Sequence, residues 1–183
     1  MQDIYDFIKQ KCLESESCHP LTLIQEMMKD ERIHMHGPEH HVLDGSCLLV
    51  ALHNVGMDFD LEKALDEMME RGRKMPGATC GQWGVCGSAA SLGAALAIVH
   101  KTTPLSSNEY YKDNLKYVSK ALDKIGDIGG PRCCKRNAFL SMLTMIDFVK
   151  ERYGIELEKE NVECEFSSMN KQCIKEECPF FKR

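Results

Sequence analysis

Apolar residues recur three or four positions apart along most of the chain, and strict alternation of apolar and polar residues is almost absent. This spacing is typical of amphipathic helices and not of strands. The pattern therefore predicts an all-α fold, with strand structure limited to one short segment within residues 155–166. The predicted helices cover residues 3–13, 20–28, 38–55, 60–73, 85–100, 107–125 and 133–153.

Residues that start and stop helices support these limits. Pro20 and Pro38 stand at predicted first turns, where proline is favoured, and Asp60 can cap the helix that follows it. Gly56 and Gly154 stand where helices are predicted to end. Two glycine-containing stretches, 76–84 and 126–132, are predicted loops.

The segment 85–100 consists mainly of Gly, Ala and Ser, with a few larger apolar residues. Small side chains permit close approach of neighbouring backbones, and about 15 residues are too few to cross a bilayer. We therefore predict a compact bundle of about seven helices around this Gly/Ala-rich central helix. Residues 1–155 would form the helical domain, and residues 156–183 a small Cys-rich C-terminal appendage packed on it, which a metal ion could staple.

Composition narrows the classes of function. The 183 residues are 43% hydrophobic and 28% charged, which is typical of a globular protein. The net charge of −5 argues against a broad cationic face for nucleic acid. We find no apolar run of about 18 residues and no signal-like start, so we expect a cytoplasmic protein without a membrane partner. The oligomeric state is left open.

Ten cysteines are unusual for a cytoplasmic chain of this size. Disulfides persist poorly in a reducing compartment, and a domain this large does not need them for stability. The cysteines are therefore better interpreted as metal ligands or reactive thiols.

A histidine cluster occupies HMHGPEHH at 34–41. His40 and His41 would lie in the first turn of a helix, and His36 could fold back over its end, so three imidazoles can converge on a metal. Asp44, four residues after His40, would share its face and could fix its tautomer. The alternative is that these histidines only bond loop carbonyls.

Two cysteines, Cys80 and Cys86, flank the sequence GQWGV. Cys86 would lie in the first turn of the small-residue helix, where the helix dipole and free N–H groups favour a thiolate. Trp83 could wall a pocket there. The alternatives are a structural buried cysteine and an ordinary loop anchor.

Adjacent thiols, Cys133 and Cys134, begin the last long helix among three cations. The helix dipole and the local positive charge should depress their pKa values, which would make them nucleophilic, oxidisable or metal-bound. Arg132, Lys135 and Arg136 could bind a phosphate or carboxylate. The alternative is a solvated basic turn with one core cysteine.

The tail carries Cys164, Cys173 and Cys178 in a poorly apolar segment, which suggests an element held by a metal. Cys12 or Cys18 could supply a fourth ligand if the chain ends meet. A [4Fe–4S] cluster and Zn²⁺ both fit thiolate ligands. Free thiols in a loose tail are the alternative.

Three motifs, HGPEHH at 36–41, CGQWGVCG at 80–87 and GGPRCCKR at 129–136, resemble an uncharacterised archaeal and bacterial domain family of unknown function. The resemblance covers roughly residues 30 to 178. Longer relatives carry an N-terminal Cys-rich ribbon, of which Cys12, Cys18 and His19 resemble a remnant. The layout is also similar, with different spacing, to proteins described as redox-active and named for a C-G-C-A-x-x-G-C-C pattern. Neither resemblance implies an established reaction.

We interpret the chain as a Cys/His protein whose three motifs meet in one pocket. The pocket would hold an iron–sulfur cluster or another thiophilic metal, with zinc as an alternative, and would transfer electrons or sulfur with a small anionic substrate or a redox partner protein. A metal-free thiol–disulfide oxidoreductase and a non-catalytic metal- or partner-binding module are the alternatives. The expected ligands or redox thiols are Cys80, Cys86, Cys133 and Cys134; the expected further ligands or acid/base groups are His36, His40 and His41; and the expected anion-binding residues are Arg132, Lys135 and Arg136.

Overall fold

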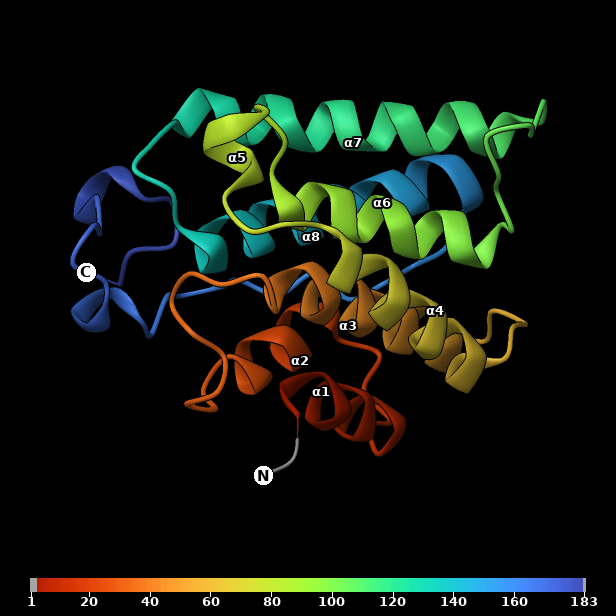
Figure 1. Cartoon of the computed structure of the whole chain (residues 1–183), viewed down its shortest axis with the longest axis horizontal. Helices are drawn as coiled ribbons and strands as arrows, with labels where there is room; N and C mark the ends of the chain where they lie inside the picture. The colour runs from red at the N-terminus through yellow and green to blue at the C-terminus, as the bar shows by residue number, and fades with distance from the viewer. Residues whose placement is uncertain (1–2, 183) are drawn as a thin grey trace.

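Helix α3 (His40–Asn54) lies at the centre of the molecule, with 13 consecutive residues buried from His40 to Leu52. A computed structural model, which describes residues 3–182, shows the other helices arranged around it (Figure 1). Helix α6 (Gly87–Val99), the Gly/Ala-rich helix, is the second central helix and packs against α3. The remaining helices are α1 (Ile4–Leu13), α2 (Pro20–Met27), α4 (Leu61–Lys74), α5 (Thr79–Gln82), α7 (Glu109–Ile128) and α8 (Cys134–Tyr153).

The helices form layers on either side of the α3–α6 pair. Helices α1, α2 and α4 pack on α3, whereas α7 and α8 pack on α6 and on each other. The seven long helices confirm the predicted all-α bundle, and the buried Gly/Ala-rich helix confirms the predicted central element. Helix α3 is buried as well, so the core is built on two helices.

The predicted cap at Asp60 forms, and Asn108 caps α7 in the same way. The side-chain oxygen of Asp60 accepts a hydrogen bond from the Lys63 N–H at 3.1 Å, and that of Asn108 accepts one from the Tyr111 N–H at 3.4 Å. These bonds satisfy N–H groups that have no partner inside their helices. Gly154 ends α8 with a φ of 67°, a conformation that glycine adopts at little cost.

Two local predictions differ from the structure. The predicted loop 76–84 contains the short helix α5, and the predicted strand within 155–166 does not form. Within residues 3–182, β structure is limited to an isolated bridge between Cys164 and Phe181, because the segment beside it pairs at this one position. The tail otherwise contains two 3-10 turns, Ser167–Met169 and Lys175–Glu177.

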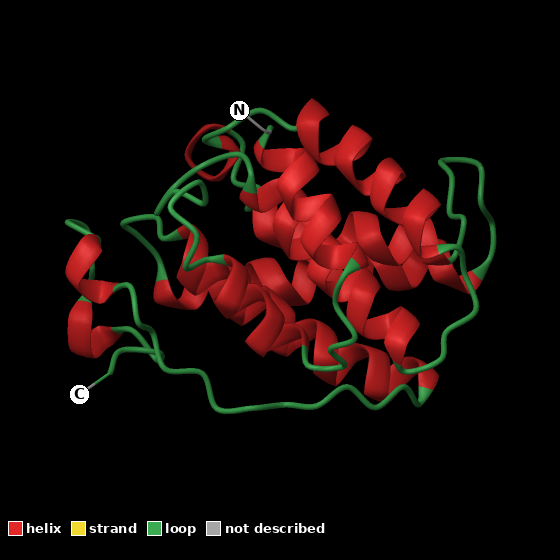
Figure 2. Cartoon of the chain, turned by 90° about the horizontal axis from the view of Figure 1, so that it is seen from below, coloured by secondary structure: helices red, strands yellow, loops and turns green. Residues whose placement is uncertain are grey.

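The tail returns to the end of the molecule at which α8 begins. Figure 2 shows the long loop that carries the chain back along the bundle after α8. Helices α3, α6 and α8 all begin at this end, and α5 lies beside them (Figure 1). The predicted domains also include residues 1, 2 and 183, which lie outside the described residues. None of the helices between residues 3 and 182 combines the length and apolar character needed to span a membrane.

Close packing of α3 on α6 depends on the absence of a side chain at Gly45. The Gly45 N–H donates to the Ser91 hydroxyl at 2.9 Å, and that hydroxyl donates to the His41 carbonyl at 2.7 Å. A Cβ atom at Gly45 would lie 2.6 Å from the Met68 sulfur and 2.8 Å from the Ser91 carbonyl oxygen. A larger residue would therefore push the helices apart.

We expect Gly45→Ala to lower the free energy of unfolding by about 1–3 kcal/mol, the usual range for overpacking a core. Gly126→Ala is the control, because a Cβ there meets no atom within 4 Å and alanine favours the helix. Urea unfolding of both variants measures the difference. Equal midpoints would show that the α3–α6 contact can relax.

Candidate functional site

A hollow of about 270 Å³ lies where the first turns of α3, α6 and α8 meet the segment around α5. We call it the His/Cys cavity. It is lined by His36, Gly37, Pro38, His40, His41, Gly77, Ala78, Thr79, Cys80, Cys86, Gly87, Ser88, Arg132, Cys134 and Asn137. The structure thus brings together thiols and imidazoles from all three sequence motifs, with the exception of Cys133.

Three helix N-termini meet at this cavity. His40 and His41 are the first residues of α3, Cys86 is the N-cap of α6, and Cys134 is the first residue of α8. Each N-terminus carries free N–H groups and the positive end of a helix dipole. The cavity therefore favours an anion or a thiolate bound to a cation.

His41 is held in one tautomer. Its Nδ1 lies 3.1 Å from the Met75 carbonyl oxygen, which can only accept a hydrogen bond, so Nδ1 carries the proton. In the neutral ring Nε2 then presents a lone pair. The ring lies against the start of α6, since a Cβ at Gly87 would come within 2.1 Å of Nε2. A lone pair fixed in this way is typical of a histidine that can bind a metal.

His40 faces a buried carboxylate, as its sequence position predicts. Its Nε2 lies 3.1 Å from the His34 carbonyl oxygen and so carries a proton, while its Nδ1 lies 3.6 Å from the Asp44 Oδ1. The Ser88 hydroxyl donates to the other oxygen of Asp44. His40, Asp44 and Ser88 are all buried. The His34 carbonyl therefore orients the His40 ring, while the Asp44 carboxylate lies beside its Nδ1 at a distance too long for a hydrogen bond.

The cavity thiols are surrounded by N–H groups but are held neutral by burial. Burial raises the pKa of Cys86, although the Asn137 amide donates to its sulfur at 3.4 Å. Burial also raises the pKa of Cys134 to about 12, against a hydrogen bond from the Gly37 backbone. The predicted depression of these pKa values is therefore wrong, because desolvation of the thiolate outweighs the helix dipole and the nearby cations.

The three cations do not act together. Arg132 is exposed and lines the cavity. Arg136 is buried and donates to the carbonyls of Gly129 and Pro131, at 2.8 and 3.1 Å, so it holds the loop before α8. Of the three cations, Arg132 alone lines the His/Cys cavity, whereas Arg136 lines a neighbouring hollow together with Arg132, Cys80 and Cys86.

Lys135 points away from the cavity. Its ammonium donates to the carbonyls of Met28 and Ile33, at 2.8 and 3.4 Å, and burial lowers its pKa to about 8. Trp83 is 64% exposed and does not line the cavity, so its predicted role as a pocket wall is wrong. Residue type alone does not reveal either position. Lys135 lies beside the carbonyls of Met28 and Ile33, and Trp83 lies in an exposed loop.

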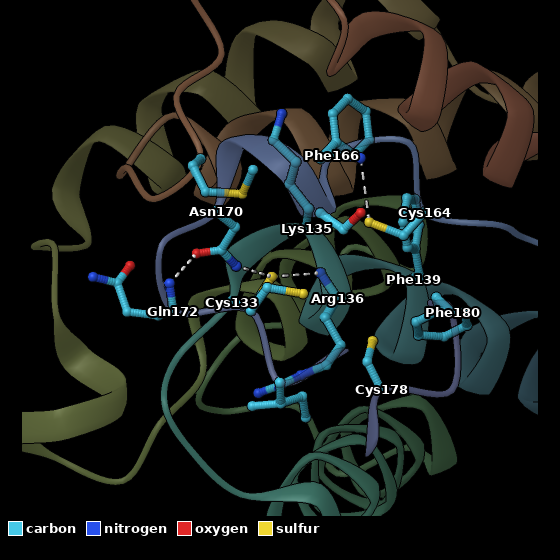
Figure 3. Close-up of a pocket in the computed structure, with 14 residues that line it drawn as sticks. Cys133, Lys135, Arg136, Phe139, Cys164, Phe166, Asn170, Gln172, Cys178 and Phe180 are labelled. Carbon is cyan, nitrogen blue, oxygen red and sulfur yellow. Dashed lines mark hydrogen bonds between the residues drawn. The ribbon is translucent and has the colours of Figure 1, made fainter. Parts of the chain in front are cut away.

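Cys133 faces a second hollow, on the side opposite to Cys134. There it meets all three tail cysteines, and Figure 3 shows Cys133, Cys164 and Cys178 around this hollow. We call Cys133, Cys164, Cys173 and Cys178 the four-cysteine group. Burial raises the pKa of Cys133 as well, which contradicts the predicted depression.

The predicted partners from the N-terminal region are placed elsewhere. Cys12 is buried in the hydrophobic core, where it interacts with Cys47, and Cys18 lines neither hollow. Cys133 thus takes the position beside the tail cysteines that the sequence suggested for Cys12 or Cys18. All ten cysteines lie within the described chain, and all are free thiols.

The sequence analysis did not single out one further group of potential metal ligands. His19, Glu158 and Glu160 place their ligand atoms within 4.8 Å of one another, and no other set of three such side chains in the described part of the chain does so. The two carboxylates are 66% and 48% exposed, and each lies within 3.4 Å of the His19 Nδ1. These contacts are those of a surface ion-pair cluster.

The model of a family of unknown function, DUF5714, matches residues 8–181. The chain belongs to this family. Membership in DUF5714 confirms the resemblance to an uncharacterised family, and the family description carries no reaction. No curated protein and no solved structure matches the chain significantly.

In the metal-free, reduced DUF5714 chain we expect Cys134 to be alkylated slowly at neutral pH, because only the thiolate is a nucleophile. A pKa of about 12, against the ordinary value of 9.0, leaves about a thousandfold less thiolate at pH 7.5. The rate should rise about tenfold per pH unit through pH 10. Mass spectrometry of iodoacetamide-treated protein measures it, with unfolded protein as the control. A plateau below pH 9 would contradict the prediction.

Proposed function

We propose that the His/Cys cavity binds an iron–sulfur cluster or another thiophilic metal and transfers electrons or sulfur to or from a small anion. The observation that carries the proposal is that Cys86, Cys134, His40 and His41, from separate parts of the sequence, line one cavity. Thiolate and imidazole together are a ligand set that suits zinc, iron and copper.

The best-placed ligands are Cys86, Cys134 and His41. Both sulfurs accept N–H hydrogen bonds, which is the arrangement that a thiolate requires, and His41 presents a lone pair at Nε2. Cys80 also lines the cavity and could supply a further sulfur. A bound metal would replace the thiol protons, so the raised pKa values of Cys86 and Cys134 are compatible with metal binding.

The dimensions favour a ligand larger than a single ion. Among residues 3–182, the cavity sulfurs and imidazole nitrogens are not gathered within 4.8 Å, and the hollow measures about 270 Å³. A cluster, or a metal together with a small substrate, fills such a space better than one tetrahedral ion. The volume is below that of typical drug-sized ligand sites, which favours a small substrate.

The expected substrate is an anion because a guanidinium group and three helix N-termini meet at the cavity. Arg132 lines the cavity beside the three helix N-termini. Anions are stabilised both by such termini and by a guanidinium group. The His40–Asp44 pair would hold or move a proton at the cavity wall during the reaction.

The two alternative functions have less support. A metal-free thiol–disulfide oxidoreductase needs an accessible thiolate, whereas burial keeps Cys86 and Cys134 protonated at neutral pH. A non-catalytic module would keep its ligands in the tail. That function would leave the convergence of thiols and imidazoles at the cavity unexplained.

We expect Cys134→Ser and Cys86→Ser to lose one metal centre that the unchanged protein contains. The test is purification of both variants without oxygen, followed by iron, zinc and sulfide analysis and absorption spectroscopy with and without dithionite. Cys18→Ser is the matched control, because Cys18 lines neither hollow.

The proposal predicts that the control keeps its full metal content and any dithionite-sensitive absorption, while both cavity variants lose part of each. Two results would contradict it. One is equal metal and sulfide content in all three variants; the other is a metal-free wild-type protein whose cysteines titrate reversibly as a disulfide pair.

A further inference from the structure

The geometry points to a second metal centre, in which Cys133, Cys164, Cys173 and Cys178 bind a thiophilic metal through four thiolates. This centre shares no lining residue with the His/Cys cavity, so it goes beyond the function proposed above. Its four sulfur-bearing residues line one hollow between the start of α8 and the tail.

The ligands come from two directions. Cys133 is the N-cap of α8. In the tail, Cys164 lies in the bridge, Cys178 ends the second 3-10 turn, and Cys173 lies between the two turns. Figure 3 shows Cys133, Cys164 and Cys178 on different sides of the hollow, with Phe139 and Phe180 beside them. Four cysteines around one space is the ligand number that both structural zinc and iron–sulfur clusters use.

Three of the four sulfurs accept backbone hydrogen bonds. The N–H groups of Phe166 and Lys175 donate to Cys164 and Cys173, each at 3.4 Å and each from two residues further along the chain. The Arg136 N–H donates to Cys133 at 3.4 Å. These local turns aim N–H groups at sulfur, which stabilises a thiolate more than a neutral thiol.

A side-chain amide adds to this set. The Asn170 amide donates to the Cys133 sulfur at 3.6 Å, and Asn170 is itself 8% exposed. Its side-chain oxygen accepts the Gln172 N–H at 3.0 Å, which fixes the orientation of the amide toward sulfur. Donors of this kind commonly surround the sulfurs of metal-bound cysteines.

Two buried cations line the same hollow. Lys135 and Arg136 are 2% and 4% exposed, and the Lys135 ammonium lies 4.1 Å from the centre of the Phe166 ring. Four thiolates around Zn²⁺ or around an oxidised [4Fe–4S] core carry about two negative charges in total. The two cations can balance that charge in a region from which water is largely excluded.

The tail contributes few side chains to the core, and polar contacts such as those of Gln25 with Glu163 and of Lys159 with Asp147 hold its first part on α2 and α8. After α8, the buried side chains are those of Leu157, Phe166, Asn170 and Phe180. Regular structure is limited to one bridge and two 3-10 turns within the described residues of this segment. A segment with so small a core is the kind that a metal commonly stabilises.

The metal could be zinc or an iron–sulfur cluster, and tetrathiolate binding is common to both. Zinc needs sulfurs about 3.8 Å apart, from its tetrahedral geometry and bond length of about 2.3 Å. Within residues 3–182 no three cysteine sulfurs lie within 4.8 Å of one another, which agrees with a wider cluster. The hollow of about 20 Å³ is too small for a cluster, so the cysteine side chains have to move apart for a cluster or together for zinc, and the test separates the two metals.

The test compares Cys173→Ser and Cys133→Ser with Cys18→Ser and Cys134→Ser, each as the full chain purified without oxygen. We expect the first pair to lose a metal centre that the second pair keeps. One zinc without sulfide, or about four irons with four sulfides, identifies the metal. Limited proteolysis should cut the tail at least tenfold faster in Cys173→Ser than in Cys18→Ser.

A wild-type measurement covers the case in which the variants do not fold. A mercurial reagent, which displaces metal from thiolates, should release this metal and expose the tail to protease. The inference is overturned if Cys173→Ser keeps the full metal complement, if Cys133→Ser and Cys134→Ser lose the same centre, or if the tail thiols of the wild-type protein are disulfides. Loss in Cys173→Ser with no loss in Cys134→Ser would support this centre and contradict the proposed cavity metal.

Discussion

The contact between α3 and α6 is the constraint on which the rest of the site depends. Gly45 has no side chain, so its backbone comes close to that of Ser91, and the Ser91 hydroxyl joins the Gly45 N–H to the His41 carbonyl. His41 belongs to this contact, and its ring lies against the residue that follows Cys86. The packing that stabilises the bundle therefore also fixes an imidazole beside a thiol.

Two electrostatic effects compete at the three helix N-termini, and burial prevails. The dipoles and N–H groups favour thiolates by a modest amount, whereas the loss of water around a buried charge costs several times more. The pKa of Cys134 consequently rises to about 12. N–H groups that point at a sulfur stabilise it most when it is a thiolate, and it would become one if a metal cation replaced the thiol proton. If the cavity binds metal as proposed, burial and the donor groups would act in the same direction.

The helices and the convergence of the motifs could be predicted from sequence, because apolar spacing and capping residues act locally. The separate directions of Cys133 and Cys134 could not. Cys133 is an extended N-cap and Cys134 is the first helical residue, so neighbouring side chains diverge, and only the path of the tail decides what Cys133 meets. The role of Lys135 was hidden for the same reason, since its partners, the carbonyls of Met28 and Ile33, lie 107 and 102 residues away.

One peptide bond separates the two groups of sulfur ligands, and this connects them physically. Cys133 fixes the start of α8, and α8 then positions Cys134 and Asn137 at the His/Cys cavity. On the other side, His36 lines the cavity and its Nε2 lies 3.3 Å from the Gln172 side-chain oxygen at the four-cysteine hollow. A tail closed by metal would hold both contacts in place. The four-cysteine group thus has a structural reason to lie beside the cavity, whether or not electrons pass between them.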